Sequence, residues 1–266
     1  MPELPEVETI KRQLEKKILD KKIVNIQINN KIVIKEPDTE SFKNGIVGET
    51  VSEVIRRAKL LIIKFKQDKF LIIHLRISGW LLYGKKEEKS RVSFELSDGN
   101  FLNYMDQRIL GELKLRRDYK DLKFIKSLGP EPFDISLKEF AKILKAKKTK
   151  IKPLLMDQTV IAGMGNIYAQ EALFAAHIDP MNTANNLNEI QVANLYKSML
   201  LVLNEGIKYK GSSVDIYRNL EGEKGGMEER LKVYGRENKP CLVCKEPIKK
   251  TLIGGRGTCF CPNCQK

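Results

Sequence analysis

The sequence predicts an α+β fold, in which an N-terminal helix and an antiparallel β-sandwich precede a helical region and a cysteine-rich β-hairpin. Three observations lead to this prediction. Apolar residues recur at helical spacing in residues 5–18, and then alternate with period two from Ile23 to about Arg116. Helical spacing returns after residue 134, and two Cys-x-x-Cys pairs follow from residue 241.

The first half is expected to hold one helix and many short strands. In residues 5–18, Val7, Ile10, Leu14 and Ile18 share one helical face. The strand candidates are rich in β-branched residues and are separated by turn residues, which is typical of a sandwich or barrel. They are 23–28, 32–34, 51–54, 60–65, 70–75, 92–96 and 101–104, the last two joined by an Asp98-Gly99-Asn100 hairpin turn.

A proline- and glycine-rich stretch, Leu128–Asp134, marks the expected domain boundary. We therefore divide the chain into a β-domain (1–130), a helical domain (131–230) and a metal-binding hairpin (231–266). The helix candidates of the second half are 137–144, 151–156, 167–176 and 189–209. Residues 211–230 contain few apolar side chains and several glycines, which indicates a loop.

The charge of the chain favours a polyanionic partner. Among 266 residues, 48 Lys and Arg face 34 Asp and Glu, for a net charge of +14. Residues 138–152 alone hold seven lysines and one acid. The excess of positive charge is therefore concentrated in certain regions, which a generally lysine-rich composition would not explain. No apolar run approaches a membrane span and no signal peptide is visible, so we expect a cytoplasmic protein without a membrane partner.

The start of the chain combines a proline with acidic residues. After removal of Met1, Pro2 would present a secondary amine, which forms a cationic iminium with an aldehyde carbon. Glu3, Glu6 and Glu8 lie near enough in sequence to exchange protons there. The alternative is an ordinary helix start, in which acidic residues favour the positive end of the helix dipole.

Four cysteines predict a zinc site. Cys241 and Cys244 form one Cys-x-x-Cys pair, and Cys261 and Cys264 form a second pair after sixteen intervening residues. Four protein ligands leave no open position, so one zinc ion per chain would be structural. Lys249, Lys250 and Arg256 lie between the pairs and suit phosphate contacts, whereas Cys259 lies outside the spacing and is expected to pack as a small apolar residue.

Three further stretches are candidates for nucleic-acid contacts. In Gly163–Ala169, glycines precede a helix start at Asn166, an arrangement that binds phosphate or serves as a plain N-cap. His74–Gly79 and Asp106–Gly111 each place an arginine beside a bulky apolar residue. Such loops suit a wedge that enters a base stack, although ordinary hairpin ends share the pattern.

Together these pieces resemble the bacterial formamidopyrimidine-DNA glycosylase family along the whole chain. The motifs that carry the resemblance are Pro2–Thr9, Arg56-Arg57-Ala58-Lys59, Asp106-x-Arg108, Gly165–Ala169, Val233-Tyr234-Gly235-Arg236 and the zinc hairpin that ends Cys261–Gln265. The resemblance implies a β-sandwich domain and a helix–two-turns–helix domain with a zinc finger, which close as a monomer around damaged double-stranded DNA. It also implies excision of oxidised purines such as 8-oxoguanine and formamidopyrimidines, followed by β,δ-elimination.

The resemblance assigns roles to individual residues. Pro2 is the nucleophile at C1′, Glu3 the acid for sugar-ring opening, and Glu6 supports the nucleophile. Lys59, expected on a strand, assists β-elimination, and Arg256 assists δ-elimination. DNA contacts are implied for His74, Ile77, Arg108, Leu110, Lys148, Lys152 and Asn166. Residues 215–227 match a loop that closes over the extruded purine.

The chain departs from the family pattern in its wedge loops. Ile77 replaces a methionine, Ile109 an arginine and Leu110 a phenylalanine, while Lys89-Ser90-Arg91 replaces a histidine-rich stretch. These changes leave the lesion ranking and the opposite-base preference open. Two other functions also remain at this point: an endonuclease VIII-like activity on oxidised pyrimidines, and a non-catalytic zinc-containing DNA-binding protein.

Overall fold

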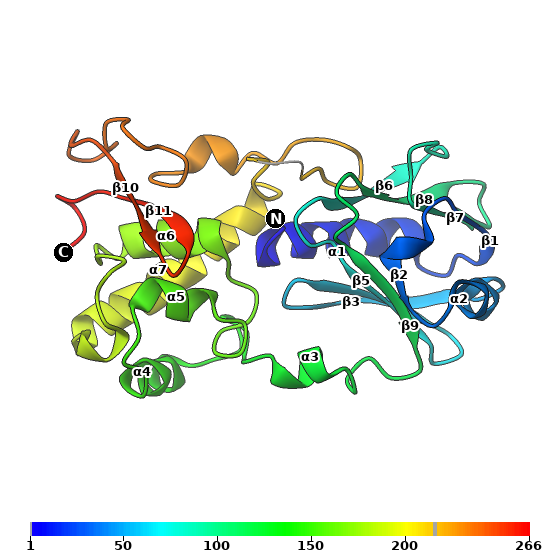
Figure 1. Ribbon diagram of the computed structural model, residues 1–266, viewed down its shortest axis with the longest axis horizontal. Helices are drawn as coiled ribbons and strands as arrows, with labels where there is room; N and C mark the ends of the chain where they lie inside the picture. Colours follow the sequence, from blue (N-terminus) through cyan, green and yellow to red (C-terminus); the bar gives the residue numbers. More distant parts are fainter. Residues whose placement is uncertain (1, 215–216) are drawn as a thin grey trace. The chain divides into compact units, whose positions relative to one another are not determined.

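The computed structural model describes residues 2–214 and 217–266, which form two compact units (Figure 1). The first unit runs to Lys126 and also contains Ile207–Glu228, whereas the second comprises Ser127–Gly206 and Glu229–Lys266. The segment after Ile207 thus belongs with the β-domain, although the sequence placed it with the helices. Within the described ranges, no helix has both the length and the apolar character of a membrane span.

In the first unit a helix lies inside a β-sandwich. Helix α1 (Leu4–Ile18) buries Val7, Ile10, Leu14 and Ile18, the residues whose spacing predicted it. These side chains share one apolar core with residues from both sheets. A helix that is covered on several sides has a fixed axis, so the residues at its N-terminal end have a fixed place as well.

Nine strands form the two sheets of this unit. They are β1 (Ile23–Ile28), β2 (Ile34–Glu36), β3 (Val51–Arg57), β4 (Leu60–Phe65), β5 (Phe70–His74), β6 (Gly79–Gly84), β7 (Val92–Leu96), β8 (Phe101–Asp106) and β9 (Glu112–Arg116). The four-stranded sheet has the order β1-β7-β8-β6 and the five-stranded sheet β2-β9-β5-β4-β3. All pairs are antiparallel except β2 with β9, so the predicted antiparallel sandwich is confirmed.

Several details of the first unit differ from the prediction. Strands β6 and β9 were not among the expected strands. Residues expected as a strand at 32–34 divide between a 3-10 turn, η1 (Lys31–Val33), and the short β2. Helix α2 (Thr39–Ile46) was not predicted. The sequence nevertheless contains two features typical of a helix. Asp38 is an N-cap residue that accepts the Ser41 N–H, and the apolar residues Phe42 and Ile46, four positions apart, are both buried.

The second unit is helical with a terminal hairpin. After α3 (Lys123–Ser127), its helices are α4 (Leu137–Lys145), α5 (Ile151–Met156), α6 (Asn166–Ala175) and α7 (Glu189–Lys208), with 3-10 turns η2 (Ala184–Asn186) and η3 (Glu228–Arg230). Strands β10 (Lys249–Ile253) and β11 (Arg256–Phe260) pair as the expected hairpin. A capping box of Ser136 and Glu139 begins α4. Helix α6 is buried on most sides, which suits its largely apolar sequence.

Candidate active site and nucleic-acid interface

The N-terminal end of α1 is held by a buried glutamate. Glu3 is the N-cap residue, and its backbone N–H donates to Glu6 Oε2 at 2.8 Å. The other oxygen, Oε1, accepts the N–H of Ser212 at 2.8 Å. Glu3 and Glu6 are 2% and 1% exposed, so neither carboxylate lies in bulk solvent. The predicted helix start is thus confirmed, and Pro2 directly precedes it.

Glu8 does not belong to this acidic group. Its carboxylate binds Arg56 at 2.8 Å and Arg12 at 2.7 Å. Burial raises the pKa of Glu8, but the hydrogen bonds from both arginines outweigh burial and leave this pKa below its usual value. Glu8 therefore stays ionised and acts as an anchor, contrary to the proton exchange expected from its position in the sequence.

Lys59 lies in the tight turn between β3 and β4, not on a strand as predicted. The turn is closed by Ala58 at φ +52°, and Lys59 is 8% exposed. Arg56 donates to both Glu8 and the Ala58 carbonyl, the latter at 3.1 Å. Through this bridge the turn that carries Lys59 is tied to the second turn of α1. The sequence pattern does not predict this bridge, because Glu8 lies 48 residues away from Arg56.

His74 ends β5 as a neutral, buried imidazole. Its Nδ1 accepts the backbone N–H of Arg76 at 3.1 Å, and the side chain is 7% exposed. Burial and the positive charge of Arg76 lower the pKa of His74 to about 3. With Nδ1 accepting, the proton is on Nε2, so this residue offers a single N–H and no charge to a phosphate.

The depressed pKa of His74 predicts an acid-sensitive first unit. Between about pH 6.5 and pH 3 the unfolded chain binds a proton that the folded one does not, so stability falls as pH falls through this window. In His74→Asn, the asparagine Oδ1 can still accept the Arg76 N–H. This variant should show a pH dependence of the free energy of unfolding that is smaller by up to about 1.4 kcal/mol per pH unit. Urea unfolding at several pH values, followed by the fluorescence of Trp80, the one tryptophan of the chain, measures this dependence. Equal slopes in both proteins would refute the prediction.

The loop Asp106–Gly111 is organised by Asp106. This carboxylate, 2% exposed, accepts hydrogen bonds through Oδ1 from Ser78 Oγ and from the N–H groups of Arg108 and Ile109. Its Oδ2 accepts the N–H of Gly111 at 2.7 Å. One side chain thereby fixes the whole turn, whereas the sequence singled out Asp106 only as a motif residue.

Removing this carboxylate should destabilise the first unit. Asp106→Ala leaves several buried N–H donors without their acceptor, and we expect a loss of about 3 kcal/mol in the free energy of unfolding. Glu53→Ala, at an exposed position of β3, should stay within about 0.5 kcal/mol of the parent. Urea titration at Trp80 fluorescence compares them, and similar midpoints would contradict the assigned role of Asp106.

The loop organised by Asp106 presents its side chains in two directions. Arg108 and Leu110 are exposed, the latter at 44%, while Ile109 (φ +56°) is partly buried against the apolar core. In the β5–β6 loop, Ile77 is 37% exposed. Both apolar residues at the positions matched to the family wedge are therefore available to a ligand, and Ile109 serves packing instead.

Lys152, matched to a phosphate contact, is fully buried instead. It lies in α5, and its Nζ donates to Thr258 Oγ1 at 2.6 Å. A buried cation must be satisfied within the protein, so Lys152 ties α5 to the hairpin strand β11 and does not offer its charge to solvent. Lys148, by contrast, is exposed in the loop before α5.

Asn166 and Gln170 join α6 to the same strand. Asn166 Nδ2 donates to the Gly257 carbonyl at 3.3 Å, and Gln170 Nε2 donates to it at 3.2 Å. Gln170 Oε1 accepts the N–H of Cys259 at 2.7 Å. Gln170 was not among the site residues expected from the sequence, although it is a buried amide within an apolar helix. Arg256 begins β11 as an exposed residue, after a Gly254–Gly255 turn with positive φ.

Glu171, the neighbour of Gln170, holds the segment before the finger. Its carboxylate accepts the backbone N–H groups of Lys232, Val233 and Tyr234 at 2.8 to 3.0 Å. Burial raises the pKa of Glu171, and the three hydrogen bonds oppose that effect. Helix α6 thus fixes the finger at two places, and sequence reasoning had assigned no role to this glutamate.

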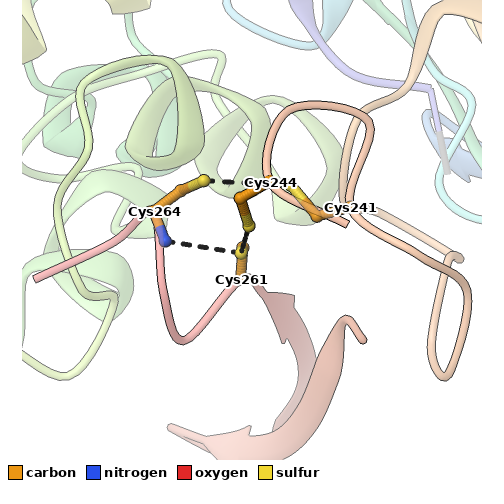
Figure 2. Close-up of side chains that lie close together, drawn as sticks. All are labelled: Cys241, Cys244, Cys261 and Cys264. Atoms are coloured by element: carbon orange, nitrogen blue, oxygen red, sulfur yellow. Dashed lines mark hydrogen bonds between the residues drawn. The ribbon is translucent and has the colours of Figure 1, made fainter. Parts of the chain in front are cut away.

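The four predicted zinc ligands converge (Figure 2). All four sulfur atoms lie within 4.8 Å of one another, with Cys241 to Cys264 at 3.9 Å and Cys244 to Cys261 at 3.4 Å. Zn–S bonds of about 2.3 Å in a tetrahedron require sulfurs roughly 3.8 Å apart, so the donor set fits one zinc ion. Cys259 packs in the small core beside this cluster, as predicted.

Three family models match consecutive parts of the chain. Residues 1–113 match the formamidopyrimidine-DNA glycosylase N-terminal domain, residues 128–218 its H2TH domain, and residues 238–266 a zinc finger found in FPG and IleRS. A β-sandwich around a helix, an H2TH domain and a four-cysteine finger together define a DNA glycosylase with a structural zinc site.

Curated relatives and solved structures agree with this class. Formamidopyrimidine-DNA glycosylases of Mycoplasma mobile and Pelotomaculum thermopropionicum are 40% and 41% identical, each over 100% of this chain and 99% of the relative. A complex of Lactococcus lactis Fpg with abasic-site DNA is 36% identical, with TM-score 0.92 over 99% of both chains. MutM with carbocyclic 8-oxo-G DNA is 37% identical, with TM-score 0.90 over 100% of both. The chain belongs to the formamidopyrimidine-DNA glycosylase family and is an enzyme.

Proposed function

We propose that this chain removes oxidised purines from double-stranded DNA and then cleaves the strand, with Pro2 as the nucleophile. The observation that carries the proposal is the construction of the N-terminal end of α1. Pro2 precedes a peptide N–H that Glu6 fixes, and the Glu8–Arg56 bridge ties the Lys59 turn to the same helix. An amine, an acid and a lysine of one compact unit thus support this proposal.

In the proposed reaction, the Pro2 nitrogen bonds to C1′ as the C1′–N bond to the base breaks. The proton of the Pro2 nitrogen passes to the departing base, and the freed nitrogen lone pair then forms the iminium as the C1′–O4′ bond breaks, while Glu3 gives a proton to O4′. Loss of a proton from C2′ expels the 3′ phosphate, and we assign Lys59 to this step. Loss of the C4′ proton then expels the 5′ phosphate, assisted by Arg256. Water then hydrolyses the iminium, which releases the sugar fragment, regenerates the Pro2 amine and leaves a one-nucleotide gap.

Binding is proposed to depend on the DNA backbone and on wedge residues rather than on base sequence, because lesions arise in any sequence. Lys148, Asn166 and the uncharged His74 are assigned to phosphates. Ile77 and Leu110 fill the space left by the extruded nucleotide, and Arg108 faces the unpaired base. Zinc, held by the four cysteines, supplies no chemistry and fixes the hairpin. We propose that the enzyme acts as a cytoplasmic monomer.

The choice of oxidised purines over oxidised pyrimidines has a direct test. Duplexes with one 8-oxoguanine or one thymine glycol are incubated separately with enzyme in excess, and strand cleavage is followed over time. We expect faster cleavage of the 8-oxoguanine duplex. Faster cleavage of the thymine glycol duplex would replace the proposal with the endonuclease VIII-like activity. A chain that binds both duplexes and cleaves neither would support a non-catalytic binder.

A further inference from the structure

Glu6 connects two backbone segments that are far apart in sequence. Its Oε2 accepts the Glu3 N–H and its Oε1 accepts the Ser212 N–H, both at 2.8 Å, across 206 residues in the second case. At 1% exposure this carboxylate has no bulk water to replace a lost donor. Displacement of Ser212 would therefore force Glu6 to reorient toward another partner.

The Glu3 N–H belongs to the peptide group that follows Pro2. A peptide group is planar, so fixing the direction of this N–H fixes the Pro2 carbonyl and the Pro2 Cα as well. The hydrogen bond that this N–H donates to Glu6 therefore sets the orientation of the residue that carries the nucleophilic nitrogen. A rotation of the Glu6 carboxylate would release that peptide plane.

Gly211 allows the Ser212 backbone to approach so closely. Its φ is +83°, and a Cβ at this position would lie 2.8 Å from Glu6 Cγ and 2.9 Å from Glu6 Oε1. The same Cβ would lie 2.9 Å from Tyr217 Cε1. Tyr217 is 4% exposed, and burial together with the negative charge of Glu6 raises its pKa, so it stays a neutral wall beside the carboxylate. Only glycine fits both the conformation and the space.

We propose that the Gly211–Ser212 backbone is a positioning element for the nucleophile and acts through Glu6. This inference rests on the proposed role of Pro2 and deepens it. Docking of Gly211–Ser212 on Glu6 locks the peptide plane after Pro2, and undocking releases it. The effect requires no contact between this backbone and a base, so it extends to DNA that already lacks the base.

The test uses the full-length mature protein and a duplex with a pre-formed abasic site. Gly211→Ala inserts the Cβ that Glu6 cannot accommodate. At saturating DNA, we expect the rate of the borohydride-trapped adduct to fall by at least about tenfold, because small misplacements of reacting groups are costly. The DNA affinity should change by less than about twofold, since no DNA contact is removed.

Two control variants separate this effect from simpler causes. Gly99→Ala adds a methyl group at φ +82° in open space, so it reproduces the backbone strain without touching Glu6. Gln13→Ala removes the hydrogen bond from Leu220 N–H and loosens the same chain segment elsewhere on α1. Both should keep the trapping rate of the parent. A rate for Gly211→Ala equal to that of either control would overturn the proposal.

A double-mutant cycle tests the route through Glu6. If Gly211→Ala acts by displacing Glu6, the trapping rate of the double variant should be close to that of Glu6→Gln alone. If the two substitutions acted independently, their fold-reductions of the trapping rate would multiply. Should Gly211→Ala fail to fold by Trp80 fluorescence, Ser212→Pro removes the N–H donor with the same expectation. A parent enzyme that forms no adduct would refute the proposed function itself, which is a different outcome from equal rates in parent and variants.

Discussion

A chain that keeps any residue before Pro2 will give no borohydride-trapped adduct with damaged DNA. An acylated proline nitrogen is an amide and has no free lone pair for attack on C1′. Loss of a covalent nucleophile costs on the order of 10⁴-fold or more in rate in enzymes of this type of mechanism. The mature protein and a form with a non-removable N-terminal extension are compared in single-turnover strand cleavage.

The affinity for DNA distinguishes a blocked amine from a folding defect in the extended form. The extended form should bind the same duplex within about threefold of the mature protein if the extension only blocks the amine. The matched variant Pro2→Gly, with its N-terminus free, keeps an α-amine. It should therefore form part of the adduct that the extended form cannot form. An extended form that still forms the adduct would show that Pro2 is not the nucleophile, because no other amine of the chain depends on removal of Met1.

Loss of zinc should unfold the hairpin and weaken DNA binding by at least about tenfold. Structural zinc sites contribute roughly 10–16 kcal/mol of apparent binding free energy, and that energy supports folding of the finger. Cys261→Ser removes one ligand of the cluster, and Arg256 then loses its fixed place in β11. Zinc content measured per chain and DNA titration at fixed ionic strength give the two readouts.

Cys259 offers the matched control for the zinc prediction. It lies two residues from Cys261, is buried in the same small core, and is not among the four clustered sulfurs. Cys259→Ala should keep one zinc ion per chain and an affinity close to that of the parent. If both variants bound DNA equally well, the finger would have no part in binding.

The sequence predicted what short-range patterns determine. The apolar spacing of α1, the continuous apolar run of β4 and the Cys-x-x-Cys pairs each lie within one element or one hairpin, so the fold class and zinc site followed directly. The candidate site was harder, because its contacts cross long stretches of chain. Glu6 meets Ser212, and Lys152 meets Thr258 106 residues away.

Lys152 and Lys59 show why residue type alone did not predict the place of a side chain in the fold. Lys152 carries the charge expected of a phosphate ligand, yet Ile151, Leu154 and Leu155 place α5 inside the unit, and its ammonium donates to Thr258. Lys59 directly precedes the apolar run Leu60–Ile63, and the short turn at Ala58 is not encoded by a glycine or asparagine. Apolar periodicity describes burial along an element and does not describe what faces a single polar side chain.

The amide of Gln170 also closes an open strand edge. It donates to the Gly257 carbonyl and accepts the Cys259 N–H, the alternate-residue pattern that a neighbouring strand would make. A strand edge with unpaired backbone groups is a template for addition of another chain. With β10 on one side and a glutamine on the other, β11 cannot recruit a second molecule. A metal-free finger that separates from α6 would expose this edge, so aggregation should accompany zinc loss.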